Sequence, residues 1–153
     1  VKHLFFVSTH LIKLACEGAL GKRPFLEVYG NDYNTKDGSC IRDYIHITDL
    51  INAHLKSLDF ILSNKGSKIF NCGYGNGFSV FDVIKSFDRV LGKPLPIKIV
   101  DRRIGDPAYL VANNRKIINE LCWAPKYNNI KKIIKDALSW EKKLSKTQKN
   151  NLD

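Results

Sequence analysis

Two arginines and one aspartate in separate polar segments are the residues of this chain best suited to bind an anion. Arg42 follows a long polar stretch, and Arg103 and Asp106 lie together in the sequence RRIGDPAY. Guanidinium groups form paired hydrogen bonds with phosphate oxygens, so two arginines on separate loops can clamp a pyrophosphate. A nearby carboxylate can accept hydrogen bonds from ribose hydroxyls. Spacing alone leaves open the alternative that each arginine only forms a surface salt bridge.

The elements that must position these residues alternate between helix and strand, which predicts an α/β or α+β-like unit with a small mixed sheet and four to five helices. Apolar residues at helical spacing predict helices over residues 9–20, 48–62, 79–91, 113–122 and 130–144. Short apolar runs predict strands over residues 25–29, 68–72 and 97–100, and a brief extended piece over residues 109–112. Thr48 and Ser79 are the expected N-caps of the second and third helices. The buried face of the second helix is expected to carry Ile51, Leu55, Leu58 and Leu62.

Composition indicates an ordinary globular protein. With 153 residues, 44% of them hydrophobic and 26% charged, residues 1–153 are expected to form a single unit. The four cysteines form no CxxC pair, which favours free thiols in a reducing cytoplasm. No apolar run approaches the roughly 20 residues that a membrane span needs.

The net charge of +10 raises the alternative of a small basic module that binds nucleic acid. Many of the lysines lie near the end of the chain and alternate with apolar residues at helical spacing. This pattern is typical of the solvated face of a helix. Binding to nucleic acid is therefore the less favoured interpretation.

Two motifs look like parts of known sites but lack the required context. Gly73, Gly75 and Gly77 have GxGxG spacing without the acidic residue of a dinucleotide fingerprint, so a tight turn is the better interpretation. Tyr127 and Lys131 have the spacing of a tyrosine base and its lysine, yet no serine or threonine is placed to complete a relay. The histidines are isolated, and no metal site is predicted.

Three longer segments of the chain read GNDYNTKDGSCIRDYIHITDL, IFNCGYGNGFSVFDVI and RRIGDPAYLVANNRKIINELCWAPKY. In this order and spacing they resemble the C-terminal half of UDP-glucose 4-epimerases, which are extended short-chain dehydrogenases. The resemblance runs from about residue 9 to about residue 140. It implies that Arg42 and Arg103 bind the pyrophosphate of a UDP-sugar and that Asp106 holds the uridine ribose.

The resemblance also implies a set of further substrate contacts. Glu27, Val28 and Tyr29 match the strand along the uracil, where Tyr29 takes the place of an aromatic residue that stacks on the base. The other matching positions contact the phosphates, the uridine or the sugar, and they are His10, Leu11, Val80 and Tyr109. His10 stands where asparagine is common, and the spacing before Tyr109 is one residue shorter than in some members.

In the family, bound NAD takes a hydride from C4 of the sugar while a tyrosine base removes the hydroxyl proton. The glycine-rich NAD loop, the relay and the tyrosine base belong to the N-terminal half, which this chain does not match. We therefore expect no Rossmann core, no NAD bound by this chain alone and no activity by itself. The lack of methionine and the start at Val1 suggest a truncated unit, with residues 1–8 as an atypical leader.

The expected partners are a UDP-sugar, bound weakly, and a separately encoded N-terminal half. Apolar surface left exposed would favour a homodimer or other self-association. The expected location is the cytoplasm, with no membrane partner. One further alternative is that the chain belongs to another enzyme that modifies nucleotide sugars.

Overall fold

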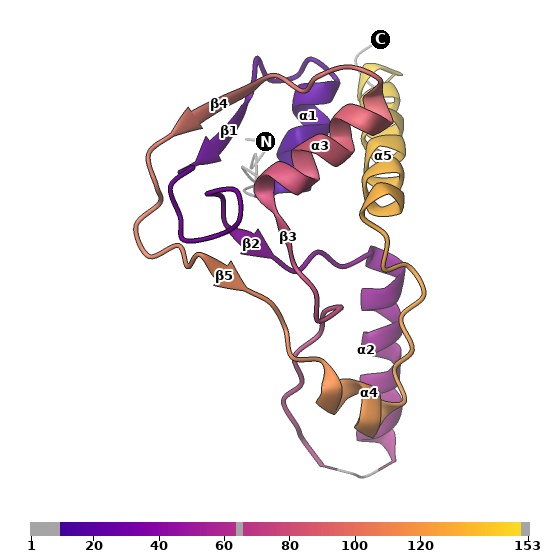
Figure 1. The fold of residues 1–153 in the computed structure, drawn as a ribbon. Helices are drawn as coiled ribbons and strands as arrows, with labels where there is room; N and C mark the ends of the chain where they lie inside the picture. The colour runs from indigo at the N-terminus through magenta and orange to yellow at the C-terminus, as the bar shows by residue number, and fades with distance from the viewer. Residues whose placement is uncertain (1–9, 64–65, 151–153) are drawn as a thin grey trace.

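The computed structural model describes residues 10–63 and 66–150 (Figure 1). Its helices are α1 (Leu11–Ala19), α2 (Ile47–Leu62), α3 (Val80–Leu91), α4 (Arg115–Leu121) and α5 (Ile130–Asn150). Its strands are β1 (Leu26–Tyr29), β2 (Ile41–Arg42), β3 (Phe78–Ser79), β4 (Ile97–Val100) and β5 (Tyr109–Leu110). The predicted α/β class, with a few short strands and four to five helices, is confirmed.

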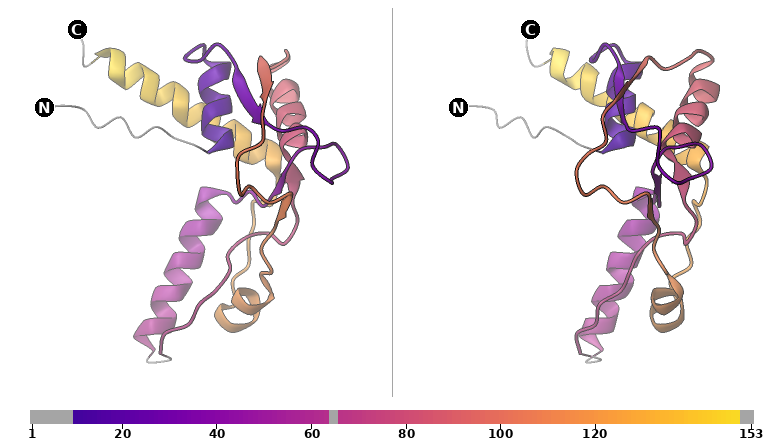
Figure 2. Two further views of the ribbon diagram at one scale, coloured as in Figure 1. Left: turned by 90° about the vertical axis from the view of Figure 1, so that its left-hand side faces the viewer. Right: turned by 60° about the vertical axis from the view of Figure 1, so that its left-hand side comes forward.

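The strands form two small sheets. β1 and β4 pair in parallel, whereas β2 pairs with β3 in the antiparallel and with β5 in the parallel direction. α1, α3 and α5 lie beside the β1–β4 pair, and the three-stranded sheet lies between this part and α2 with α4 (Figures 1 and 2). The protein therefore has two parts joined through β2, β3 and β5. The larger, upper part contains α1, α3, α5, β1 and β4, and the smaller, lower part contains α2 and α4.

The upper part is held together by apolar side chains from helices that the sequence predicted well. Val83 and Phe87 of α3 and Ile134 of α5 are fully buried. α3 begins with a capping box between Ser79 and Asp82, in which each side chain accepts a backbone N–H of the other residue. It ends at Gly92, whose φ of 70° is left-handed.

The lower part is organised around a buried carboxylate. Asp49 of α2 is 3% exposed and accepts hydrogen bonds from the Tyr74 hydroxyl at 2.6 Å and from the N–H groups of Lys126 and Tyr127 at 3.0 and 2.8 Å. The Trp123 indole donates to the Asp49 carbonyl oxygen at 3.1 Å. One residue thus joins α2 to the segment that leads into α5.

Three predictions about the lower part were wrong. The N-cap of α2 is His46, whose Nδ1 accepts from the Thr48 N–H at 3.1 Å, because the helix begins one residue before Thr48. Residues 68–72 are extended but join no sheet in the described part of the chain, and a strand needs a partner. The residues expected on the buried face of α2 are exposed, and they are Ile51, Leu55, Leu58 and Leu62. The buried side chains belong to the opposite face, with Ala53 and Phe60.

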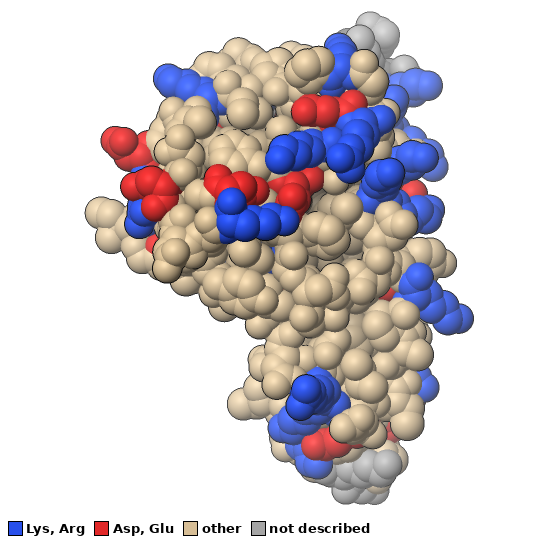
Figure 3. All heavy atoms as spheres, in the orientation of Figure 1, with Lys and Arg blue, Asp and Glu red and all other residues tan. Residues whose placement is uncertain are grey.

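The lysines of α5 lie at the surface, as a solvated helix face requires (Figure 3). The helix continues to Asn150, six residues past the predicted end. Among the described helices, none combines the length and the apolar character of a membrane span. The predicted leader, residues 1–8, lies outside the described residues.

Candidate nucleotide-binding site

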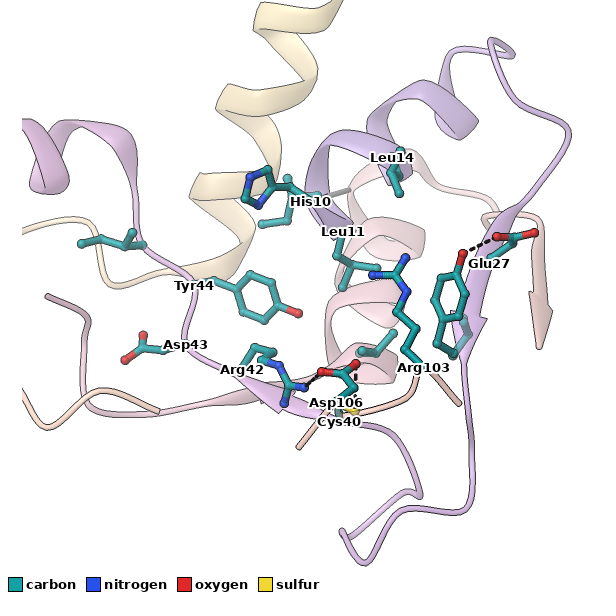
Figure 4. A pocket seen from close by; sticks show the side chains of 15 residues that line it. His10, Leu11, Leu14, Glu27, Cys40, Arg42, Asp43, Tyr44, Arg103 and Asp106 are labelled. Carbon is teal, nitrogen blue, oxygen red and sulfur yellow. Dashed lines mark hydrogen bonds and ion pairs between the residues drawn. The ribbon is translucent and has the colours of Figure 1, made fainter. Parts of the chain in front are cut away.

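A cavity of about 520 Å³ lies where α1, β1, β2 and the start of α3 meet (Figure 4). The loop between β4 and β5 closes its remaining side with Arg103 and Asp106. Its wall includes His10, Leu11, Ile12, Leu14, Glu27, Val28, Tyr29, Cys40, Arg42, Asp43, Tyr44, Ile45, Val80, Arg103 and Asp106. Segments far apart in the sequence therefore build one site, which combines apolar walls with charged groups.

Arg42 lies on β2 at the floor of the cavity and forms an ion pair with Asp106. Its other terminal nitrogen donates to the Ile41 carbonyl oxygen at 2.7 Å. The second carboxylate oxygen of Asp106 accepts from the Cys40 thiol at 3.8 Å. The side chains of Arg42 and Asp106 are 21% and 31% exposed, so this pair is better shielded from water than a typical surface pair. The two groups predicted to bind pyrophosphate and ribose contact each other.

Arg103 approaches the site from the opposite wall. Its guanidinium carbon lies 3.7 Å from the centroid of the Tyr29 ring, which is a close cation–π contact. The Tyr29 hydroxyl donates to a carboxylate oxygen of Glu27 at 2.5 Å. One face of the ring that was predicted to stack on uracil is thus covered by Arg103. Arg42 and Arg103 face the same cavity from two sides, as a clamp requires (Figure 4).

Tyr44 and Asp43 also line the cavity, although sequence reasoning did not select them. Burial raises the pKa of the Tyr44 phenol well above its usual range, although the positive charge of Arg42 opposes this shift. The phenol therefore stays protonated and is a hydrogen-bond donor rather than a base. The sequence does carry one signal for Tyr44. Side chains alternate between the two sides of an extended segment, so Tyr44, two residues after Arg42, lies on the same side as Arg42.

Asp43 fixes the backbone behind Arg42. Its carboxylate accepts the N–H groups of Tyr74 and Gly75 at 3.1 Å each and of Ala112 at 3.3 Å. A Cβ atom at Gly73 would lie 2.4 Å from this carboxylate, which explains the first glycine of the GxGxG run. Because two amides of the turn already bind Asp43, they are not free to bind the phosphates of a dinucleotide. The tight-turn interpretation therefore fits the structure.

The polar loop before β2 is held by a second carboxylate. Asp37 accepts from the Ser79 hydroxyl at 2.5 Å and from the N–H and hydroxyl of Ser39 at 3.1 and 2.8 Å. Because Ser79 is also the N-cap of α3, the loop is attached to the start of that helix. This attachment sets the direction in which the chain enters β2 and so the position of Arg42.

Nine of the ten substrate-binding residues predicted from the sequence line the cavity, namely His10, Leu11, Glu27, Val28, Tyr29, Arg42, Val80, Arg103 and Asp106. The structure places Tyr109 elsewhere, with 61% of its surface exposed. In β5, Tyr109 pairs with Ile41 and Leu110 pairs with Arg42. Because alternate residues face opposite sides of a sheet, Tyr109 points away from the side that Arg42 occupies.

The remaining motifs lie outside the cavity. Tyr127 stacks on His46 with a centroid distance of 4.7 Å, and Lys131 is exposed on α5. The part of the chain that the structure describes holds no cluster of three or more histidine, cysteine or acidic residues that could bind a metal.

A family model described as GDP-mannose 4,6 dehydratase matches residues 2–137, most of the chain. The chain belongs to this family. The UDP-glucose 4-epimerase of Azospirillum brasilense is 47% identical over 141 residues, which are 92% of this chain and 40% of the relative. This match confirms the resemblance to UDP-glucose 4-epimerases and shows that the chain spans about two fifths of such a relative.

Two solved structures are also similar to this chain. The UDP-Glc/GlcNAc 4-epimerase from Campylobacter jejuni is 46% identical with a TM-score of 0.76, over 87% of this chain and 40% of that one. The UDP-glucose-4-epimerase from Stenotrophomonas maltophila is 33% identical with a TM-score of 0.86, and the match covers 92% of this chain and 41% of that one. That structure contains bound NAD and formylated UDP-arabinopyranose.

Proposed function

We propose that this chain is the UDP-sugar-binding part of a UDP-glucose 4-epimerase and that its cavity binds uridine diphosphate. The observation that carries the proposal is the placement of Arg42 and Arg103 on opposite walls of one cavity, where Asp106, on the same loop as Arg103, forms an ion pair with Arg42. The UDP-sugar bound in the Stenotrophomonas maltophila relative supports the choice of nucleotide.

In this proposal the residues of the cavity have distinct roles. Arg42 and Arg103 neutralise the pyrophosphate charge, and Asp106 exchanges its contact with Arg42 for the ribose hydroxyls. Tyr44 donates a hydrogen bond, since its raised pKa keeps its proton in place. A base that removes a proton from the sugar must have a pKa nearer to the working pH, which Tyr44 does not have.

We further propose that the chain alone binds the nucleotide without NAD and does not epimerise the sugar. The support is that the GxGxG turn donates its amides to Asp43 and that Tyr127 and Lys131 lie outside the cavity. The sugar chemistry then depends on residues and a cofactor that another part of such an enzyme supplies. The unpaired cysteines are compatible with work in a reducing cytoplasm.

Isothermal titration of the chain with UDP tests the proposal. Arg42→Ala and Arg103→Ala should each weaken UDP binding roughly 10- to 100-fold, because hydrogen bonds to charged groups contribute about 1.5–3 kcal/mol. The matched control is Arg115→Ala, which removes an exposed arginine of α4 outside the cavity and should leave the affinity within about twofold. The proposal fails if the unaltered chain shows no binding at millimolar UDP. It also fails if the three variants lose affinity equally.

A further inference from the structure

The polar loop before β2 contains a buried phenol whose hydroxyl group is not satisfied. Tyr33 is 6% exposed, and its hydroxyl oxygen is shielded from water. This oxygen has no hydrogen-bond partner of normal geometry among the residues that the structure describes. No other buried side-chain nitrogen or oxygen in the described part of the chain lacks a partner. A buried polar group without a partner destabilises a fold, so this exception needs a physical reason.

The backbone and the ring of Tyr33 are both fixed by contacts that do not involve its hydroxyl. The backbone N–H donates to the Gly38 carbonyl oxygen at 2.9 Å, and the carbonyl oxygen accepts from the Thr35 N–H at 2.7 Å. The Arg102 guanidinium carbon lies 4.2 Å from the centroid of the ring. The ring edge packs on Gly30, where a Cβ atom would come within 2.7 Å of it. The fold therefore holds the hydroxyl at one position.

This position is beside the charged end of the nucleotide cavity. Burial is the main cause that raises the pKa of the Tyr33 phenol, and contact with the Cys40 thiol and the negative charge of Asp106 raise it further. Cys40 and Asp106 both line the cavity, and the thiol donates to the Asp106 carboxylate at 3.8 Å (Figure 4). The phenol therefore keeps its proton and is a hydrogen-bond donor close to a carboxylate of the site.

The inference that follows rests on the proposed binding of uridine diphosphate. In this structure Arg42 forms an ion pair with one oxygen of Asp106. The proposed function moves Arg42 to the phosphates, which leaves the carboxylate free to turn. We propose that Tyr33 is a positioning residue of the nucleotide site, whose hydroxyl donates a hydrogen bond to Asp106 once the ribose has replaced Arg42 there. This bond replaces part of the stabilisation that Arg42 gave the carboxylate, and it orients the oxygens that accept from the ribose hydroxyls.

Tyr33→Phe tests the proposal, because it removes the hydroxyl and keeps the ring that contacts Arg102. Isothermal titration should show UDP binding that is weaker by at least about fivefold, since a hydrogen bond to a charged group is lost. Tyr127→Phe is the matched control, which removes a hydroxyl outside the cavity and should leave the affinity within about twofold. Without UDP, Tyr33→Phe should be at least as stable in urea as the unaltered chain, because the hydroxyl that it removes has no partner.

A double-variant cycle separates this role from a purely structural one. In the Asp106→Ala background, titrated at millimolar UDP, Tyr33→Phe should change the affinity by no more than about twofold, because the group that it positions is gone. Equal losses in the two backgrounds would overturn the proposal. Lower stability of Tyr33→Phe without UDP would also overturn it, because the hydroxyl would then have a partner before the nucleotide binds.

Ultraviolet difference spectra provide a second measurement. A phenol that begins to donate to a carboxylate absorbs at longer wavelength, so UDP should produce a tyrosine difference band that is reduced in Tyr33→Phe and kept in Tyr127→Phe. An identical band in Tyr33→Phe and the unaltered chain, or equal UDP affinity of these two, would overturn the role of Tyr33 and leave the proposed function intact. If the unaltered chain does not bind UDP, both proposals fail.

Discussion

Asp49 is expected to be the most important polar residue for the stability of the lower part. Asp49→Asn keeps the size of the side chain but replaces one acceptor oxygen with an NH₂ group that faces N–H and O–H donors. The carboxylate accepts three hydrogen bonds at 3.0 Å or less. Hydrogen bonds to a charged group contribute about 1.5–3 kcal/mol each, and the amide oxygen retains part of this. We expect the free energy of unfolding to fall by about 2–4 kcal/mol at pH 7.

The pH dependence of this loss follows from the pKa of Asp49. Burial alone would raise this pKa, but the hydrogen bonds from Tyr74, Lys126 and Tyr127 outweigh it and hold the pKa below its ordinary value of 3.8. The stabilisation is therefore fully present above the pKa of the unfolded chain, about 3.9, and is lost as the pH falls through the lower folded value. The difference between the unaltered chain and Asp49→Asn should narrow below about pH 4.

Urea denaturation, followed by circular dichroism, measures the loss of unfolding free energy at pH 7 and its change with pH. The matched control is Asp59→Asn, an exposed carboxylate on the same helix, which should change stability by no more than about 0.5 kcal/mol. Tyr74→Phe removes only one of the three donors and should cost less than Asp49→Asn. Equal stability of Asp49→Asn and Asp59→Asn at pH 7 would refute the reasoning. A difference that stays constant down to pH 2 would refute the assigned role of the charge.

Two further predictions concern the cysteines and the glycines. Burial raises the pKa of the Cys16 thiol to about 12, so iodoacetamide at pH 8 should modify exposed Cys122 first, and mass spectrometry showing earlier labelling of Cys16 would contradict this. Gly38→Ala should destabilise the loop before β2, because a Cβ there would lie 1.9 Å from the Asn31 carbonyl oxygen at a φ of 79°. Gly21→Ala, at a similar φ but with nothing within 4 Å, should cost clearly less in thermal melts.

Elements with local signals could be predicted from the sequence. The capping box and the final glycine of α3 depend on residues within the helix or beside it, and β4 matches its predicted bounds. The two-residue strands β2 and β3 were not predicted, because only their contact with each other makes them strands. The same limit explains the error at residues 68–72, whose apolar pattern predicts a strand but not the partner that completes one.

In the site and in α2, the sequence likewise predicted which residues matter but not how their side chains pack. Arg42, Arg103 and Asp106 were found through a family resemblance, whereas their ion pair and the cover of Tyr29 by Arg103 depend on side-chain positions. Periodicity showed that α2 has an apolar stripe, but it could not show which of two faces this chain covers by itself. The buried carboxylate of Asp49 was missed because polar residues are normally assigned to the surface.

The cavity draws its walls from residues that extend from His10 to Asp106 along the chain. No short piece of the polypeptide can reproduce it, because its two arginines face the same cavity only after distant segments have packed. A nucleotide held there would bind the folded state and not the unfolded one, so occupancy and folding are coupled equilibria. At a ligand concentration of 100 times Kd, this coupling adds about 2.7 kcal/mol to the stability of the fold. The supply of nucleotide would then determine how much of the chain is folded.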